Sequence, residues 1–189
     1  MEEERDALEC LQNDPEAFAD SADAESLFVE LYEQLHRHAS DLMRKERRNH
    51  TLQPTALLHE AYLRIANSKT SFRDKNHFVA TASIVLRHIL VNYARAKGAK
   101  KRGENTAQLS IHDVAEQFQD ACVDILALDS ALQELAQLDS MQHRLVELRF
   151  FGGLTNREAA EALGISERSA YSEWAHARAW LKCQLGDDG

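Results

Sequence analysis

The chain has 189 residues, of which 44% are hydrophobic and 28% charged, so it can build a packed core in one or two domains. No apolar run reaches membrane-spanning length, the acidic N-terminus is no signal peptide, and three distant cysteines exclude a disulfide framework, so we expect a cytoplasmic protein. The formal net charge of −9 argues at first against a nucleic-acid partner, but the charges are unevenly distributed.

Acidic side chains crowd the start of the chain and basic side chains its middle. Between residues 1 and 33, Arg5 is the only base among many acids, whereas between residues 64 and 103, Asp74 is the only acid among many bases. A solvated surface is the ordinary reason for such a run. Here the bases stand beside aromatic residues, which favours a polyanionic partner.

Three stretches of helical spacing follow an acidic tail over residues 1–22. The first runs from Ala24 to about Arg48, with apolar positions Leu27, Phe28, Leu31, Leu35, Leu42 and Met43. Pro54 opens the second, which continues to about Ala66, because proline suits the first position of a helix. The third extends from His77 to Ala96 and leads into a basic loop, with a core-spaced face of Phe78, Ala82, Val85, Ile89 and Tyr93.

A metal site is rejected in the second of these helices. His59 and Glu60 begin like the zinc-protease motif HExxH, in which two histidines four residues apart bind the metal. Position 63 is leucine, so the motif fails. We expect no cofactor, and no spacing typical of a catalytic triad or phosphate loop appears elsewhere.

The chain divides in the polar stretch from Glu104 to Asp124, which we predict to be a linker. Apolar residues then mark a helix from Ile125 to Leu138 and another from Met141 to Phe151, which Gly152 and Gly153 close. No strand pattern appears. We therefore expect an all-α fold of two small helical domains, whose C-terminal member is a four-helix unit.

The stretch from Thr155 to Leu181 has the pattern of a helix-turn-helix. Thr155 and Glu158 form a capping box, Gly164 ends the first helix, and Ser166 caps the second. The second helix has a predicted buried stripe: Ala170, Trp174, Ala177 and Leu181. In such motifs the second helix enters the DNA major groove, although an ordinary helical hairpin has the same pattern.

Three segments together resemble the extracytoplasmic-function (ECF) sigma factors of bacterial RNA polymerase, in the branch found especially in planctomycete-type bacteria. They are HTLQPTALLHEAYLRIAN at 50–67, FVATASIVLRHILVNYARAKGAKKRG at 78–103, and LRFFGGLTNREAAEALGISERSAYSEWAHARAWL at 148–181. The resemblance implies that residues 23–103 bind core polymerase and the minus-ten element, that 104–124 form a linker, and that 125–189 bind the minus-thirty-five element.

The resemblance also implies roles for individual residues. Polymerase binding falls to Leu57, His59, Glu60, Leu63 and Arg64. Minus-ten contacts fall to Arg87, Asn92, Arg95, Lys97, Lys100, Lys101 and Arg102. Recognition of the minus-thirty-five element falls to Ser166, Arg168, Ser169, Tyr171, Ser172 and His176. The implied partners are core RNA polymerase, promoter DNA and an anti-sigma factor, and we expect a monomer when the factor is free of polymerase.

The predicted reading helix departs from the family pattern. Relatives usually carry one or two basic residues after the position of Ala170, whereas this chain has Tyr171, Ser172 and Glu173. Acids also outnumber bases from Asp139 onward. Because phosphate contacts dominate nonspecific affinity, we expect this domain to bind isolated DNA weakly and to depend on polymerase for its placement.

Two other functions fit parts of the sequence. A stand-alone helix-turn-helix regulator of duplex operator DNA explains Thr155–Leu181 equally well, but it leaves the Pro54 helix and the basic helix unexplained. A helical adaptor that binds only proteins is disfavoured by the excess of bases between residues 64 and 103. The non-enzymatic sigma factor is the hypothesis that covers all three segments.

Overall fold

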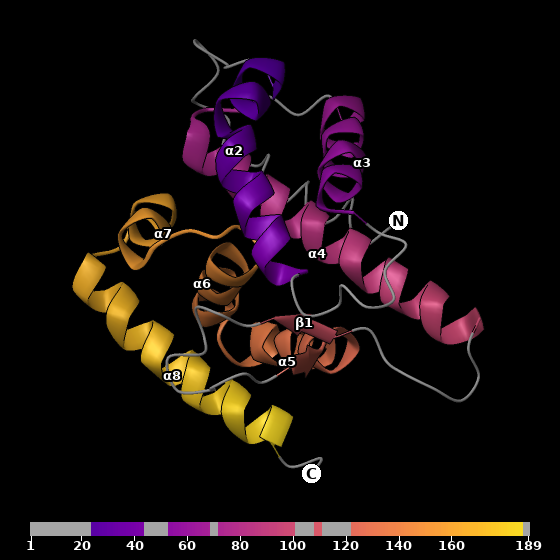
Figure 1. Ribbon diagram of the computed structural model, residues 1–189. Helices are drawn as coiled ribbons and strands as arrows, with labels where there is room; N and C mark the ends of the chain where they lie inside the picture. The colour runs from indigo at the N-terminus through magenta and orange to yellow at the C-terminus, as the bar shows by residue number, and fades with distance from the viewer. Residues whose placement is uncertain (1–23, 44–52, 69–71, 101–107, 111–121, 187–189) are drawn as a thin grey trace.

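Helices make up most of the structure. The computed structural model describes residues 24–43, 53–68, 72–100, 108–110 and 122–186. Its helices are α2 (Ala24–Leu42), α3 (Pro54–Asn67), α4 (Lys75–Lys100), α5 (Ile125–Leu138), α6 (Ser140–Phe150), α7 (Asn156–Leu163) and α8 (Glu167–Gly186). Figure 1 shows α2 and α3 above α4, with α5 to α8 below it. The helical class predicted from the sequence is confirmed.

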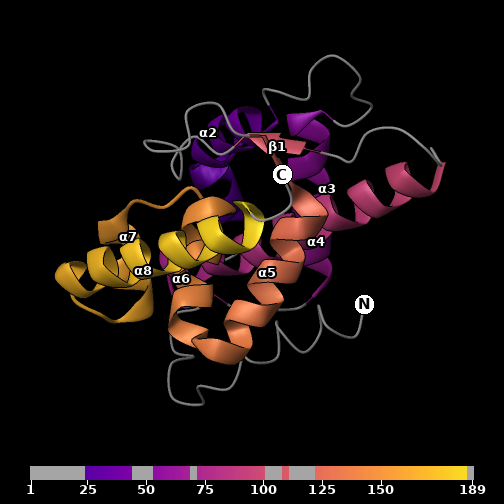
Figure 2. The same ribbon diagram turned by 90° about the horizontal axis from the view of Figure 1, so that it is seen from below.

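The helices α2, α3 and α4, which we call the N-terminal unit, bury the apolar stripes that the sequence indicates. Pro54 starts α3 after the extended Gln53. Phe72 and Phe78 are fully buried and pack edge to face, with ring centroids 5.1 Å apart. α4 is longer than predicted at both ends, and its C-terminal end projects from the other helices (Figures 1 and 2).

The helices α5 to α8, which we call the C-terminal unit, are delimited by capping residues. Asp124 accepts a hydrogen bond from the backbone N–H of Leu126 and so caps α5. Asp139 ends α5 and accepts from the N–H groups of Met141 and Gln142 at the start of α6. One aspartate therefore separates two helices without a longer loop, since its carboxylate satisfies the first free amides of α6.

The stretch between the units departs from the sequence prediction. Strands β1 (Gln108–Ser110) and β2 (Cys122–Asp124) pair antiparallel, with Leu109 opposite Val123. The expectation that no strand would form was therefore wrong. Strands of this length are too short to establish an alternating apolar pattern, so nothing in the sequence distinguishes them from a loop. The residues between the two strands lie outside the described part.

The two units pack against each other along α4, which contacts α5, α6 and α7. Their buried apolar side chains form one continuous cluster. The turn after α6 comes closest, because a Cβ placed on Gly152 would lie 2.3 Å from Oγ of Ser83 in α4. Gly153 has a φ of +67° and lies against His38 of α2. Glycine is thus required on both counts, for space at one position and for conformation at the next.

Candidate polymerase and promoter interface

The first helix of the helix-turn-helix is fixed by the capping box that the sequence predicts. Oγ1 of Thr155 accepts from the Glu158 amide at 3.3 Å, and the Thr155 amide donates to the Glu158 carboxylate at 2.8 Å. The hydrogen bond from the Thr155 backbone, followed by that from its hydroxyl, lowers the pKa of Glu158 below its ordinary value. Gly164 ends α7 in the left-handed conformation with a φ of 67°. These contacts set the start and the end of α7.

The second helix, α8, is held against the C-terminal unit by its buried side. Ser166 caps it by accepting from the Ser169 amide at 3.0 Å. The guanidinium of Arg149 lies 4.0 Å from the ring centroid of Trp174, within the range of a cation–π interaction. Gln142 also donates to Glu173 at 2.9 Å. The four predicted stripe residues are all buried: Ala170, Trp174, Ala177 and Leu181.

The opposite side of α8 is open to solvent around its N-terminal turns. All the residues predicted to read the minus-thirty-five element are exposed: Ser166, Arg168, Ser169, Tyr171, Ser172 and His176. Tyr171 is 56% exposed, which is unusual for so large an aromatic side chain. This part of the helix therefore presents a polar face with Arg168 as the one base among the predicted readers, whereas basic side chains are common on DNA-reading helices.

The residues predicted to bind polymerase are only partly exposed on α3. Leu63 is 46% exposed, and His59 is exposed beside it on the same helix. Glu60 and Arg64 form an ion pair of 2.7 Å along the helix. Leu57 departs from the prediction, since it is fully buried in the core. It lies two turns from Ile65 on the inward stripe, so it supports the helix rather than contacting a partner.

The residues predicted to contact the minus-ten element fall into four groups along α4 and beyond it. Asn92 and Arg95 are exposed. Arg87 is only 8% exposed, so the expectation that it faces DNA does not hold in this arrangement of the units. Lys97 and Lys100 belong to the projecting end of α4, although their side chains lie outside the described part. Lys101 and Arg102 lie outside it altogether.

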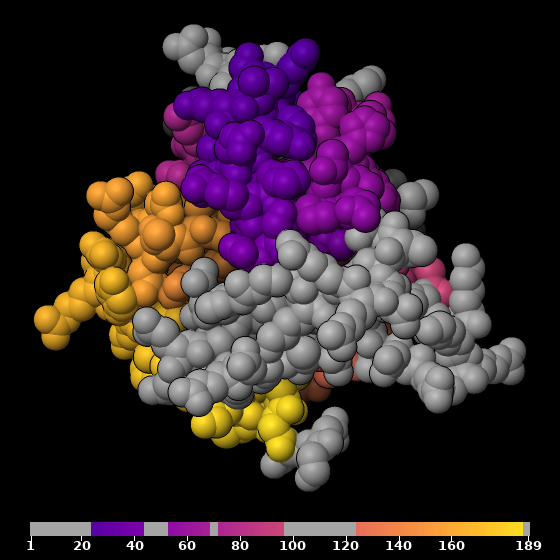
Figure 3. All heavy atoms as spheres, in the orientation of Figure 1, coloured from indigo at the N-terminus to yellow at the C-terminus, as the bar shows by residue number. Residues whose placement is uncertain are grey.

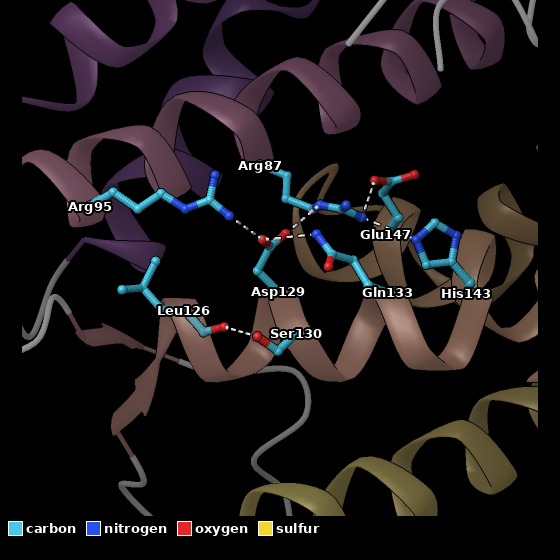
Figure 4. A network of polar contacts seen from close by, with 8 residues as sticks. All are labelled: Arg87, Arg95, Leu126, Asp129, Ser130, Gln133, His143 and Glu147. Carbon is cyan, nitrogen blue, oxygen red and sulfur yellow. Dashed lines mark hydrogen bonds and ion pairs between the residues drawn. The ribbon is translucent and has the colours of Figure 1, made fainter. Parts of the chain in front are cut away.

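Arg87 is the centre of a polar cluster between the two units (Figure 4). Its Nε lies 3.2 Å from Oδ1 of Asp129 in α5, and its Nη1 donates to Oε1 of Glu147 in α6 at 3.0 Å. Arg95 also pairs with Asp129, at 3.3 Å. Nη1 of Arg87 donates a second bond to Nε2 of His143, at 3.0 Å. The cations thus come from the N-terminal unit and the carboxylates from the C-terminal unit.

Burial shifts the pKa values of the two titratable groups on α6 in opposite senses. Desolvation raises the pKa of Glu147 from 4.5 to about 6, although Arg87 opposes this shift. Desolvation, followed by the charges of Arg87 and Arg144, lowers the pKa of His143 from 6.5 to about 4. A neutral His143 is also what the geometry requires, because a guanidinium can only donate and Nε2 must therefore accept.

Acidification should weaken the folded state through His143. The stability that its neutral ring contributes is present above pH 6.5 and is lost as the pH falls towards 4, about 2 kcal/mol by pH 5. Glu147 acts in the opposite sense, because its contribution is greatest below pH 4.5 and is lost as the pH rises through about 6. Chemical denaturation of wild type and His143→Gln between pH 7 and 5 measures the difference. As the pH falls from 7 to 5, wild type should lose more free energy of unfolding than the variant, because the variant has no imidazole to protonate. Parallel pH profiles of the two proteins would contradict this assignment.

The carboxylates of the cluster were not among the predicted site residues. Both carry a signal in hindsight, since each interrupts an apolar pattern. Asp129 directly follows Leu128 in the α5 stripe, and Glu147 lies between Val146 and Leu148. A charged residue within a core stripe indicates a buried partner, because burial of an unpaired charge is strongly unfavourable. The identity of that partner depends on the packing of the units and not on local sequence.

The described residues form neither a metal site nor a membrane span. Across the described ranges, no cluster of histidine, cysteine or acidic side chains is arranged to hold a metal ion. None of the described helices is both long and apolar enough to cross a bilayer.

Comparison with known proteins identifies the class. A family model described as "ECF sigma factor" matches residues 17–187, so the chain belongs to the ECF sigma factor family. No curated protein sequence matches the chain. Among solved structures, it is similar to the sigma factor RpoE from Bartonella quintana, crystallised in complex with the anti-sigma factor NepR. The identity is 17%, with 87% of this chain and 98% of that chain covered, and the TM-score is 0.39.

Membership of this family gives the general function. The protein is a sigma factor, which binds core RNA polymerase and directs promoter recognition and transcription initiation. The family is not a family of enzymes. The family prediction made from the three sequence segments is confirmed, whereas the branch within the family stays a prediction.

Proposed function

We propose that three surfaces of this factor divide the work of initiation. Residues 23–103 form the domain that binds core polymerase through α3 and the minus-ten element through the end of α4. Residues 104–124 link it to the domain of residues 125–189, whose α8 reads the minus-thirty-five element. The factor acts in the cytoplasm and has no catalytic activity of its own. An anti-sigma partner holds it inactive. These three proposals rest on the family alone.

The exposed face of α8 supports this division most directly. Capping contacts and buried stripe residues hold the helix by one side, while six predicted readers remain open to solvent on the other. Arg168 is the one base among them, so phosphate contacts can contribute little to affinity. Such a helix needs to be placed by another contact. The α3 surface and the basic end of α4 would provide that placement.

The decisive experiment mixes the purified factor with core polymerase and assays stable association and promoter-dependent transcription. Association with transcription from a defined set of promoters supports the proposal. Failure to associate would refute it. Tight binding to a palindromic duplex without polymerase would instead favour the operator-binding regulator, because a dimeric helix-turn-helix protein binds half-sites about one helical turn apart on its own.

Leu63→Glu should weaken docking on polymerase and leave the fold intact. The side chain is 46% exposed, so a carboxylate there costs the free protein little, while an apolar contact with a partner would be lost. We expect a loss of about tenfold or more in affinity for core polymerase, measured by fluorescence anisotropy of labelled factor.

The matched control for Leu63→Glu is Val29→Glu on the neighbouring α2, where Figure 3 shows both helices at the surface. Val29 is 69% exposed and lies outside the proposed docking surface. Its replacement introduces the same charge and removes a similar apolar group. Equal losses of affinity in the two variants, or no loss in either, would show that α3 does not carry the docking contact.

A further inference from the structure

The contact between the two units is continuous with their apolar cores and also contains a polar part. Its polar part joins Arg87 and Arg95 of α4 to Asp129 and Glu147, and a second bond joins His38 of α2 to the carbonyl of Phe150 at 2.8 Å. The closest backbone approach is made by Gly152, opposite Ser83. Contacts between domains that separate in function are typically more polar than domain cores.

The cluster also has the chemistry of a nucleic-acid contact. Two carboxylates around a guanidinium offer charged oxygens much as a phosphate does, and arginine binds both groups through the same donors. Arg87 and Arg95 are two turns apart on one side of α4, and Asp129 neutralises both. The C-terminal unit thus covers Arg87 and pairs with Arg95 on the helix to which we assign the minus-ten contact.

Separation of the units would not leave these charges unsatisfied. Asp129 and Glu147 are nearly inaccessible in the packed arrangement, with side-chain exposures of 6% and 8%. In an opened arrangement water would solvate them, and the desolvation penalty of a buried ion pair would be recovered. The raised pKa of Glu147 agrees with this, since burial of its carboxylate is only partly compensated by Arg87. The buried ion pairs can therefore hold the two units together and still allow them to separate.

We propose that the cluster of Arg87, Arg95, Asp129 and Glu147 is an autoinhibitory latch. In the free factor, the two carboxylates hold the C-terminal unit on α4, where they bury Arg87 and pair with the more exposed Arg95. Engagement of polymerase and promoter separates the units, and single-stranded DNA takes the place of the carboxylates on Arg87 and Arg95. This inference rests on the proposed role of α4 in binding the minus-ten strand.

The first test removes the carboxylate charges from the full-length protein with the double variant Asp129→Asn, Glu147→Gln. Small-angle X-ray scattering should show a larger radius of gyration, and circular dichroism should show unchanged helical content. Affinity of the free factor for a labelled single strand of mixed sequence should rise about tenfold, within the usual range for coupling between two conformations. The matched control is Glu25→Gln, Glu33→Gln, which removes the same charge from two exposed positions on α2.

The second test opens the interface without any change in charge. Ser83 is fully buried opposite Gly152, so Ser83→Leu introduces a side chain that the packed arrangement cannot hold. It should reproduce the expansion and the tighter binding of the single strand. The latch would be overturned if Asp129→Asn, Glu147→Gln did not expand, lost helical content, or expanded without binding the single strand more tightly. An equal gain in single-strand affinity in the control variant would also overturn it.

The two proposals fail in different ways. If wild type with core polymerase gives no promoter-dependent transcription, the assignment of the surfaces fails whatever the scattering shows. If wild type transcribes and the variants neither expand nor bind the single strand more tightly, the latch fails and the assignment of the surfaces remains.

Discussion

Replacement of Phe151 by alanine should lower the free energy of unfolding by about 3–5 kcal/mol, the usual cost of removing a buried phenylalanine ring. Phe151 is fully buried at the end of α6, and its ring packs edge to face on Phe150 with centroids 4.7 Å apart. It directly precedes Gly152, whose backbone lies against α4. A cavity at this position therefore weakens the C-terminal unit and its contact with the N-terminal unit together.

Urea denaturation followed by far-ultraviolet circular dichroism measures this loss. Phe151→Leu keeps most of the volume and should cost less than about 1.5 kcal/mol. Tyr171→Ala removes an exposed ring and should have almost no effect on stability, since most of its surface is already in water. A small loss for Phe151→Ala, similar to that of Phe151→Leu, would show that the site collapses without a cavity.

Replacing Lys100, Lys101 and Arg102 by alanine should reduce promoter affinity of the polymerase complex about a hundredfold at about 0.15 M salt. Each phosphate contact contributes about 0.9 to the slope of log affinity against log salt, so the slope should fall by about 3. α4 projects beyond the other described helices at the end where Lys100 lies (Figure 2). That position suits contact with a nucleic acid held by polymerase.

Titration of labelled promoter DNA at several salt concentrations measures this slope. The control removes three cations elsewhere, with Arg37→Ala, Lys75→Ala and Lys182→Ala. Both triple variants have the same net charge, so a specific contact shows as a difference between them. A slope equal to that of wild type would exclude phosphate contact by the basic run, and equal reductions in both variants would indicate a general charge effect.

Local signals in the sequence were sufficient for the helix-turn-helix. Thr155, Glu158, Gly164 and Ser166 act on neighbouring amides and carbonyls, so their roles follow from spacing alone. The same holds for Asp139, where the predicted interruption between two helices proved to be a cap. Apolar periodicity similarly identified the buried stripe of α8. The helix packs by one face on its own unit, so the apolar residues of that face are the buried ones.

Prediction failed where a residue's surroundings come from a distant segment. Arg87 lies off the main apolar stripe of α4, so its sequence position predicts an exposed side chain. Its partners Asp129 and Glu147 follow 42 and 60 residues later. Leu57 shows the converse, since a helix with a broad apolar face does not reveal from its sequence how much of that face is covered. The structure buries Leu57 and leaves Leu63 open.

Helix α4 packs against α3 of its own unit and against α5, α6 and α7 of the other unit. This limits which segments can be exchanged with those of another sigma factor. If α5 to α8 were exchanged for the equivalent segment of another sigma factor, Asp129 and Glu147 would leave with them, and Arg87 would meet a surface not matched to it. If the proposed latch is correct, such a chimera would lose the charge pairing that holds the two units together in the free factor. Arg87, Asp129 and Glu147 should therefore be inherited together, which makes these three positions informative when natural variants of this factor are compared.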